Sequence, residues 1–98
     1  MKFEWDENKN KKNLDKHFVS FEQAKEVFND KKRIEQPDIR KDYGEPRIKV
    51  IGKAKNLMLS VIYTMRGAVA RLISARSASR NERKDYDNKN EPNNGKQD

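Results

Sequence analysis

Arginines and tyrosines are the residues of this chain whose types suit chemistry on a phosphate. The first arginine is Arg33, and most of the others follow in the second half of the chain. The side chains in question are Arg47, Lys49, Arg71, Arg76, Arg83, Tyr63 and Tyr86. A guanidinium presents a planar fork of donors that matches phosphate oxygens, and a tyrosine ring can stack on a base. Gathered in one pocket, these groups would bind a phosphate together with a neighbouring base.

Such a set is also sufficient for one kind of catalysis. Cleavage of RNA without a metal takes its nucleophile, the 2′-hydroxyl, from the substrate. The protein must hold the phosphate in line and neutralise the charge on its oxygens. Because binding without cleavage needs the same residues, these residues alone favour binding to nucleic acid or to an acidic protein over catalysis.

Other chemistries find no support in the sequence. The chain has one histidine, His17, and no cysteine, so it offers neither a pair of histidines for acid–base work nor a thiolate metal site. The four glycines are scattered and form no phosphate-binding loop. We therefore expect no metal and no cofactor.

Composition limits the size of the core and indicates the kind of partner. The 98 residues suffice for one domain, and 33% apolar against 40% charged residues predict a small core. The net charge of +7 favours a polyanionic partner, although many of the lysines could simply be solvated. Residues 1–6 lack the apolar segment of a signal peptide, and no run is long enough to span a membrane, so we expect a cytoplasmic protein.

The predicted sheet contains three or four antiparallel strands. Leu57–Thr64 and Val69–Arg76 form a hairpin around Gly67, and the first of them is apolar on both faces. Strict alternation would place Leu72, Ser74 and Arg76 on one side of the second strand, and Arg71, Ile73 and Ala75 on the other. Further strands are predicted at Lys32–Gln36 and Arg47–Gly52, joined by a polar loop over Pro37–Pro46. Phe3-Glu4-Trp5 could be an edge strand or an apolar lead-in.

The predicted helices begin at recognisable caps. Asp6 caps a helix over Glu7–His17, whose main apolar anchor is Leu14. Ser20 and Gln23 form a capping box for a second helix, and Ser79 with Glu82 forms one for a last helix that ends near Tyr86. Ser77 is an alternative cap for that last helix.

Taken together, these elements predict an α+β fold. Two N-terminal helices, a small antiparallel sheet and a C-terminal helix make one domain over residues 1–86, with the helices on one side of the sheet. In the second helix, Phe21, Ala24, Val27 and Phe28 form the buried stripe. The polar segment 87–98 is predicted to be a disordered tail.

The chain resembles the BrnT toxin family, the toxin halves of bacterial type II toxin–antitoxin pairs. The pieces that match, in the family's order, are Phe3-Glu4-Trp5-Asp6, Lys9, Asn13, Lys16-His17, Val19-Ser20-Phe21-Glu22, Ala24, Val27-Phe28, Asp30, Gly44-Glu45, Arg47, Gly52, Val61-Ile62-Tyr63-Thr64, Leu72-Ile73-Ser74-Ala75-Arg76, Glu82-Arg83 and Tyr86. One departure is Phe18, where the family usually has glycine. If that position needs a left-handed backbone, phenylalanine would cost about 1 kcal/mol.

The resemblance implies a RelE-like fold and a metal-independent ribonuclease that inhibits translation. It also implies a small DNA-binding antitoxin that binds the toxin tightly and, as a complex, represses its own operon. On this reading Arg47, Arg76 and Arg83 stabilise charge, and Tyr63 or Tyr86 contacts the base or ribose. Lys49, Arg71 and Arg80 would bind RNA.

Two alternatives remain open at this stage. The general base is unassigned, with His17, Glu45 and Glu82 as candidates, and Arg76 could instead have a structural role in fixing the last helix through Glu82. The chain could also be a non-catalytic nucleic-acid-binding module or corepressor.

Overall fold

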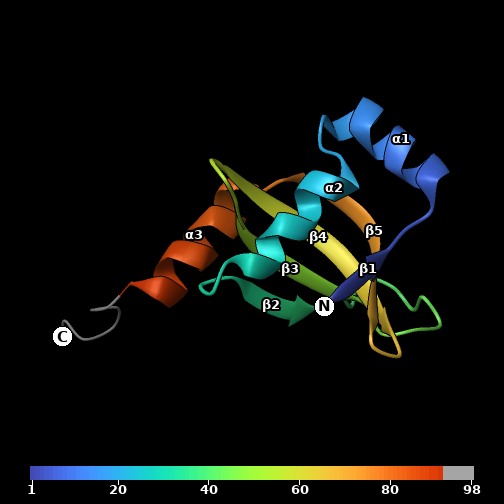
Figure 1. Cartoon of the computed structure of the whole chain (residues 1–98). Helices are drawn as coiled ribbons and strands as arrows, with labels where there is room; N and C mark the ends of the chain where they lie inside the picture. Colours follow the sequence, from blue (N-terminus) through green and yellow to red (C-terminus); the bar gives the residue numbers. More distant parts are fainter. Residues whose placement is uncertain (92–98) are drawn as a thin grey trace.

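The structure is a computed structural model that describes residues 1–91 (Figure 1). In chain order its elements are β1 (Lys2–Glu4), α1 (Glu7–His17), α2 (Phe21–Ala24), the 3₁₀ helix η1 (Lys25–Asn29), β2 (Ile34–Pro37), β3 (Ile48–Ala54), β4 (Leu57–Arg66), β5 (Val69–Ser77) and α3 (Arg80–Asn90). The predicted α+β class is confirmed, and the predicted strands agree with the observed ones to within about two residues at each end.

The sheet has five strands in the order β1-β5-β4-β3-β2. The prediction of three or four antiparallel strands was incomplete, because Lys2–Glu4 forms an edge strand that pairs with β5 in parallel. Parallel pairing is possible here because nearly the whole domain lies between the two strands in sequence and supplies the crossover. Pro37 ends β2 at the opposite edge, where its missing N–H leaves no ladder bond unmade.

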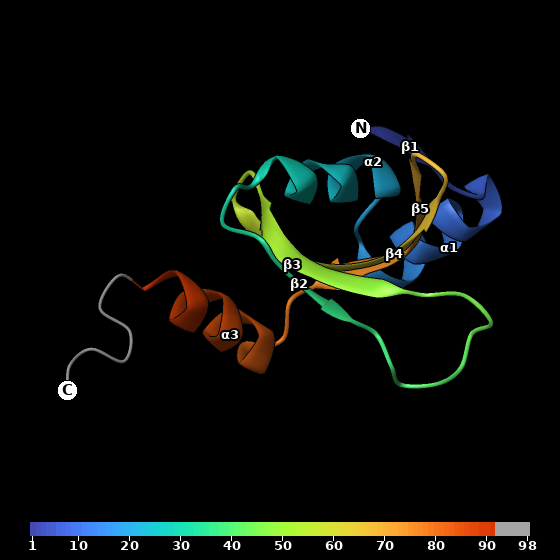
Figure 2. The same cartoon turned by 90° about the horizontal axis from the view of Figure 1, so that it is seen from below.

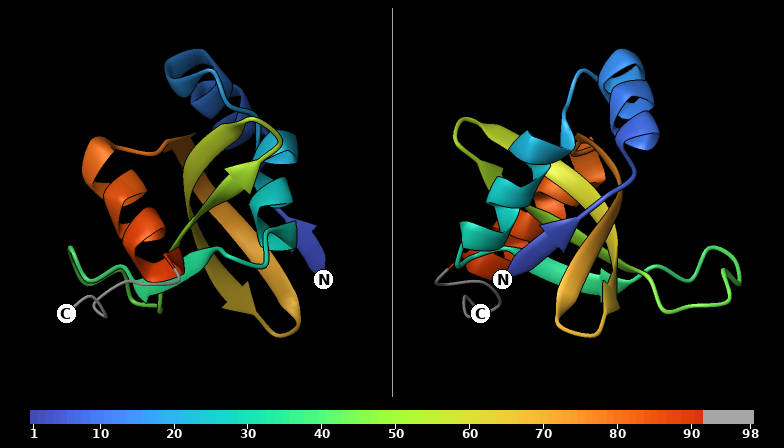
Figure 3. Two further views of the ribbon diagram at one scale, coloured as in Figure 1. Left: turned by 90° about the vertical axis from the view of Figure 1, so that its left-hand side faces the viewer. Right: turned by 45° about the vertical axis from the view of Figure 1, so that its right-hand side comes forward.

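Helices cover both faces of the sheet, so the prediction that they share one side was wrong. Figures 2 and 3 show α2 and η1 on one face and α3 on the other. The reason lies in β3, where the neighbouring residues Val50 and Ile51 are both fully buried. Adjacent strand residues point to opposite faces, so each face needs its own cover.

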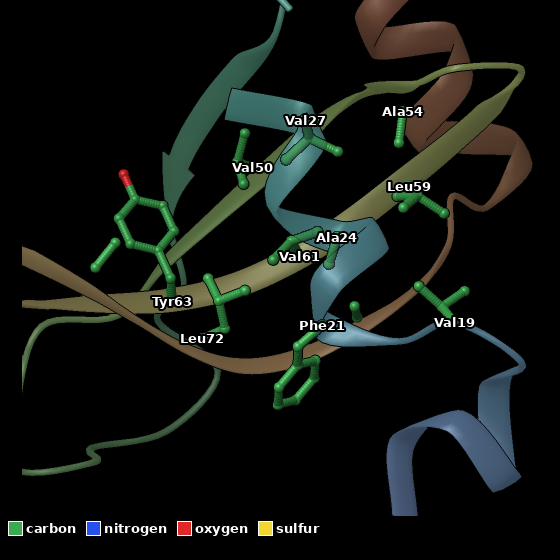
Figure 4. Close-up of a cluster of buried hydrophobic side chains, with 12 residues drawn as sticks. Val19, Phe21, Ala24, Val27, Val50, Ala54, Leu59, Val61, Tyr63 and Leu72 are labelled. Carbon is green, nitrogen blue, oxygen red and sulfur yellow. The ribbon is translucent and has the colours of Figure 1, made fainter. Parts of the chain in front are cut away.

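The larger core lies under the N-terminal helices (Figure 4). Phe21, Ala24 and Val27 are fully buried there against strand residues that include Leu59 and Val61. The predicted helical stripe is thus confirmed, except that Phe28 is only partly buried at its edge. The smaller core on the opposite face consists of Ile51, Ala78 and Tyr86, with Ile34 and Met58 packed against it.

A bulge in the β4–β5 ladder overturns the predicted alternation of β5. Tyr63 pairs with Leu72 while Ile62 pairs with Ser74, so Ile73 is an extra residue. Beyond the bulge, each residue of β5 lies on the opposite face of the sheet from the one that strict alternation predicts. Leu72 and Ala75 are consequently buried in the same core, and Arg76 contacts Glu82 on the α3 face instead of sharing a side with Leu72.

Polar side chains attach α1 to the domain. Leu14, predicted as its anchor, is 45% exposed, whereas Asn13 is only 7% exposed. The Asn13 amide donates to Val19 O at 2.8 Å and to Ala75 O at 2.7 Å, and its oxygen accepts from Ala75 N at 3.1 Å. One turn earlier, Asn10 Oδ1 accepts from Phe21 N at 2.8 Å. Apolar periodicity cannot reveal an anchor of this kind.

The predicted caps are confirmed at all three helices. Asp6 accepts from Asn8 N and Lys9 N, and both capping boxes are complete. However, α3 continues to Asn90, whose side chain donates to Lys32 O and Tyr86 O. Residues 87–90 are therefore helical, contrary to the predicted tail, and residues 92–98 lie outside the described residues.

Phe18 ends α1 in a left-handed conformation, with φ 61° and ψ 27°. Its side chain is 82% exposed, so it gains little burial in return for the backbone strain. We expect Phe18→Gly to raise the free energy of unfolding by about 0.5–1 kcal/mol, since relief of the strain outweighs the entropy cost of glycine. Urea denaturation measures this. Lys16→Gly, inside the helix, should lower stability by a similar amount. A loss of stability in Phe18→Gly would show that the ring contributes contacts.

Asn13→Leu should lower the free energy of unfolding. The substitution keeps a similar volume but leaves the buried Ala75 N–H and two carbonyls without their partner, at a cost of about 2–4 kcal/mol. Leu14→Asn is the matched control and should change the free energy of unfolding by less than about 0.5 kcal/mol. Equal effects of the two substitutions would contradict the anchoring role of Asn13.

Candidate active site

A pocket of about 250 Å³ opens on the α3 face of the sheet. Its lining residues are Gln36, Pro37, Asp38, Ile39, Arg40, Lys49, Ser60, Ile62, Ser74 and Arg76. The central strands supply the floor, because Lys49, Ile62 and Ser74 stand side by side across the ladder, as do Ser60 and Arg76. The bulge at Ile73 gives Ser74 and Arg76 this orientation. The end of β2 and the following loop form the wall.

Two cations from different strands meet on one carboxylate at this pocket. Arg76 Nη1 lies 2.8 Å from Glu82 Oε1, and Arg76 Nη2 lies 2.9 Å from Glu82 Oε2. Lys49 Nζ lies 2.9 Å from the same Oε2. Ser60 Oγ donates to it at 3.4 Å, and the Ser79 N–H donates to Oε1 at 2.8 Å. Glu82 thus caps α3 and joins that helix to β3 and β5.

The pKa of Glu82 follows from these contacts. Burial by itself would raise this pKa, but the hydrogen bonds from Arg76, the Ser79 N–H and Lys49 outweigh burial and hold the pKa well below the usual range. Glu82 is therefore charged throughout the physiological pH range and is a poor proton acceptor. This argues against Glu82 as the general base.

The two predicted tyrosines lie in the two cores instead of at the pocket. Tyr63 is 5% exposed in the larger core, and its hydroxyl donates to Glu35 at 2.6 Å. Tyr86 is 4% exposed in the smaller core and donates to Asp30 at 2.7 Å. Burial, reinforced by these hydrogen bonds, raises the pKa of Tyr63 well above its usual value and that of Tyr86 to about 12. The predicted gathering of arginines around both rings was wrong.

The remaining predicted cations are dispersed. Arg71 Nη1 pairs with Glu4 at 3.0 Å and ties β5 to β1. Arg83 Nε donates to Ala78 O at 3.4 Å at the start of α3, where Arg80 is exposed. Arg47 lines a second hollow next to the pocket. Among the eight predicted residues, the structure brings only Lys49 and Arg76 together in the pocket.

The two other candidates for the general base lie outside the pocket. Glu45 is held by Arg47 at 3.4 Å and approached by Arg66 at 3.7 Å. His17 ends α1, which packs on β5 through Asn13 on the face of the larger core.

The loop between β2 and β3 was predicted from the sequence, but Arg40 and Tyr43 within it were not predicted as site residues. Arg40 lines the pocket and binds Asp38 with two hydrogen bonds, of 2.8 and 2.9 Å. The Arg40 guanidinium holds the pKa of Asp38 below its usual value, and the carboxylate in turn raises the pKa of Arg40. The same loop contains Tyr43. The mixture of acidic, basic and aromatic residues in this loop was a signal that it could contact a ligand. Hydrophobic periodicity, however, cannot predict where a loop lies relative to β5.

Within residues 1–91, no group of three or more His, Cys, Asp or Glu side chains is placed to hold a metal ion. None of the helices there has the length and apolar character needed to cross a membrane.

The fold and pocket define a small, basic α+β domain with a cationic site on one sheet face. A family model described as "Ribonuclease toxin, BrnT, of type II toxin-antitoxin system" matches residues 5–82. The chain therefore belongs to the BrnT family of ribonuclease toxins, and the resemblance read from the sequence is confirmed. Membership implies an RNA target and an antitoxin partner. Comparison with curated proteins gave no match.

The lowered pKa of Glu82 gives a pH-dependent prediction. Because the folded pKa lies below the unfolded value of about 4.3, the stabilisation is fully present above that value and is lost as the pH falls through the folded pKa. We expect Glu82→Gln to lower the free energy of unfolding by about 1–3 kcal/mol at pH 7. This range allows for solvent screening, because Arg76 is partly exposed. The difference from wild type should shrink below about pH 4.

Urea denaturation at a series of pH values measures this difference. Glu22→Gln is the matched control, because Glu22 pairs with Lys25 at the surface and should contribute little at any pH. A loss in Glu82→Gln that stays constant from pH 7 to about pH 3 would contradict the assignment.

Proposed function

We propose that the chain is a metal-independent, RelE-like endoribonuclease whose active site is the pocket over β3, β4 and β5. One observation carries the proposal: Arg76 and Lys49, from strands on either side of β4, reach the same carboxylate at 2.8–2.9 Å. Two cations that meet on one carboxylate are also placed to contact two oxygens of one phosphate.

Glu82 orients these cations without using all their donors. A guanidinium has five N–H donors, and within residues 1–91 Arg76 uses three of them, on Glu82 and on Ser77 O. An ammonium has three donors, of which Lys49 uses one. The remaining donors belong to side chains that line the pocket, so an RNA phosphate can bind while Glu82 stays in place.

The chemistry is a transfer of the phosphoryl group within the substrate. The 2′-oxygen forms a bond to phosphorus as the bond to the 5′-oxygen breaks, which leaves a 2′,3′-cyclic phosphate and a 5′-hydroxyl. Arg76 and Lys49 neutralise the charge that develops on the phosphate oxygens. We propose that water accepts the 2′-hydroxyl proton and supplies one to the 5′-oxygen, since the low pKa of Glu82 makes it a poor base.

The biological setting follows from the family. We propose that the toxin acts in the cytoplasm, inhibits translation by cutting RNA, and is neutralised by a small antitoxin that also binds operator DNA. The net charge of +7 supports a polyanionic substrate.

Cleavage of total RNA by purified variants in EDTA tests the active site. Arg76→Ala alone would leave Glu82 partly unpaired, so the informative pair is Glu82→Gln and the double variant Arg76→Gln/Glu82→Gln. We expect Glu82→Gln, which removes the orienting carboxylate but keeps both cations, to cleave more slowly than wild type, and the double variant to lose at least about a further 100-fold in rate, because only the latter lacks the guanidinium. Arg33 pairs with Glu35 on β2, and Arg33→Gln is the control that should cleave like wild type.

Growth after expression without antitoxin gives a second readout, in which wild type should arrest growth and the double variant should not. Equal cleavage by Glu82→Gln and the double variant would contradict the site. Loss of all cleavage in EDTA would contradict metal independence. Binding of RNA by wild type without any cleavage would favour the alternative of a non-catalytic binding module.

A further inference from the structure

The loop between β2 and β3 projects beside the pocket. It spans residues 38–47 and extends beyond the sheet (Figure 2). Its base is closed by Asp38 N, which donates to Arg47 O at 2.8 Å, and by Thr64 Oγ1, which donates to Pro46 O at 2.6 Å. At its tip Gly44 adopts φ +75°, and its N–H donates to Asp42 at 2.9 Å. The loop can therefore hold a side chain in a defined position.

Tyr43 is the aromatic residue of this loop, and cations surround it. The Arg47 guanidinium carbon lies 4.0 Å from the centre of the ring, which is a stacking distance. Lys41 Nζ is a looser neighbour at 5.4 Å, on an exposed side chain that a ligand can displace. Unlike Tyr63 and Tyr86, Tyr43 is only half-buried. A half-buried ring beside an arginine is suited to stacking on a nucleobase.

The hollow that contains Tyr43 adjoins the phosphate pocket. This second hollow, of about 500 Å³, is lined by Tyr43 and Arg47, and it shares Pro37, Asp38 and Ile39 with the first pocket. A strand of RNA with a phosphate at Arg76 can thus continue across the shared wall into the second hollow. Ile39, exposed on that wall, offers an apolar contact on the way.

We propose that Tyr43, backed by Arg47, is a stacking platform for an unpaired base next to the phosphate that Arg76 and Lys49 bind. The inference rests on the proposed function for the nature of the ligand, and it adds a residue that determines which RNA is accepted. Stacking needs a base that is free of a duplex, so the preferred substrate is single-stranded.

A different role for Tyr43 would be to stiffen the loop by packing on Arg47. The two roles predict different effects of the bases in the ligand. Stacking contributes affinity only when the ligand carries a base, whereas a stiffened loop aids binding of the backbone as well.

The test is a fluorescence-anisotropy titration with a labelled 2′-O-methyl RNA hexamer of mixed sequence, which cannot be cleaved because its 2′-oxygen is blocked. A hexamer with the same backbone and no bases is the matched ligand. We expect Tyr43→Ala to bind the base-containing hexamer about tenfold more weakly and the abasic hexamer within about twofold of wild type. Tyr43→Phe and Tyr43→Trp should bind both hexamers like wild type, because they keep a ring.

Lys41→Gln is the control for charge and should weaken binding of both hexamers by the same factor. The stacking role is overturned if Tyr43→Ala leaves both affinities unchanged, if it weakens both equally, or if Tyr43→Phe is as weak as Tyr43→Ala. These binding results and the result of the cleavage assay are independent of each other. A wild-type enzyme that cuts RNA, with Tyr43→Ala unaffected in binding, refutes the stacking alone; base-dependent binding without any cleavage refutes the ribonuclease alone.

Discussion

The Glu82 carboxylate connects more of this structure than any other single group described above. It completes the capping box of α3, receives two hydrogen bonds from Arg76 of β5 and pairs with Lys49 of β3. Burying a carboxylate is costly unless several donors satisfy it, so the position of the helix and the orientation of the two cations depend on each other. The helix that covers the second face of the sheet therefore also fixes the geometry of the candidate active site.

The bulge at Ile73 is the second constraint. Without the extra residue, Arg76 would share a side with Leu72 and face the apolar core under the N-terminal helices. With it, β5 buries Leu72 and Ala75 on one face and presents Ser74 and Arg76 on the other. A local irregularity in the ladder thus allows one short strand to complete the core and to supply the guanidinium.

Local signals in the sequence predicted local structure well. The caps at Asp6, Ser20 and Ser79 are governed by residues within one turn, which is why they were found correctly. The anchoring of α1 by Asn13, the placement of α3 and the contacts of Tyr63 depend on residues far apart in sequence. Of the site, Arg76 was predicted to stabilise charge and Lys49 to bind RNA, and the two do meet at the pocket, but composition could not place Arg40 and Tyr43 beside them.

Observing Arg76 while RNA binds tests most directly whether this pocket holds the phosphate. In ¹⁵N-labelled protein titrated with an uncleavable 2′-O-methyl RNA, we expect the Arg76 side-chain N–H and Lys49 ammonium signals to shift together and to saturate at the same concentration. The signals of the Arg33 and Arg71 side chains, which pair with Glu35 and Glu4, should not shift. Shifts confined to Arg33 or Arg71, with Arg76 unchanged at saturation, would contradict this role of the pocket.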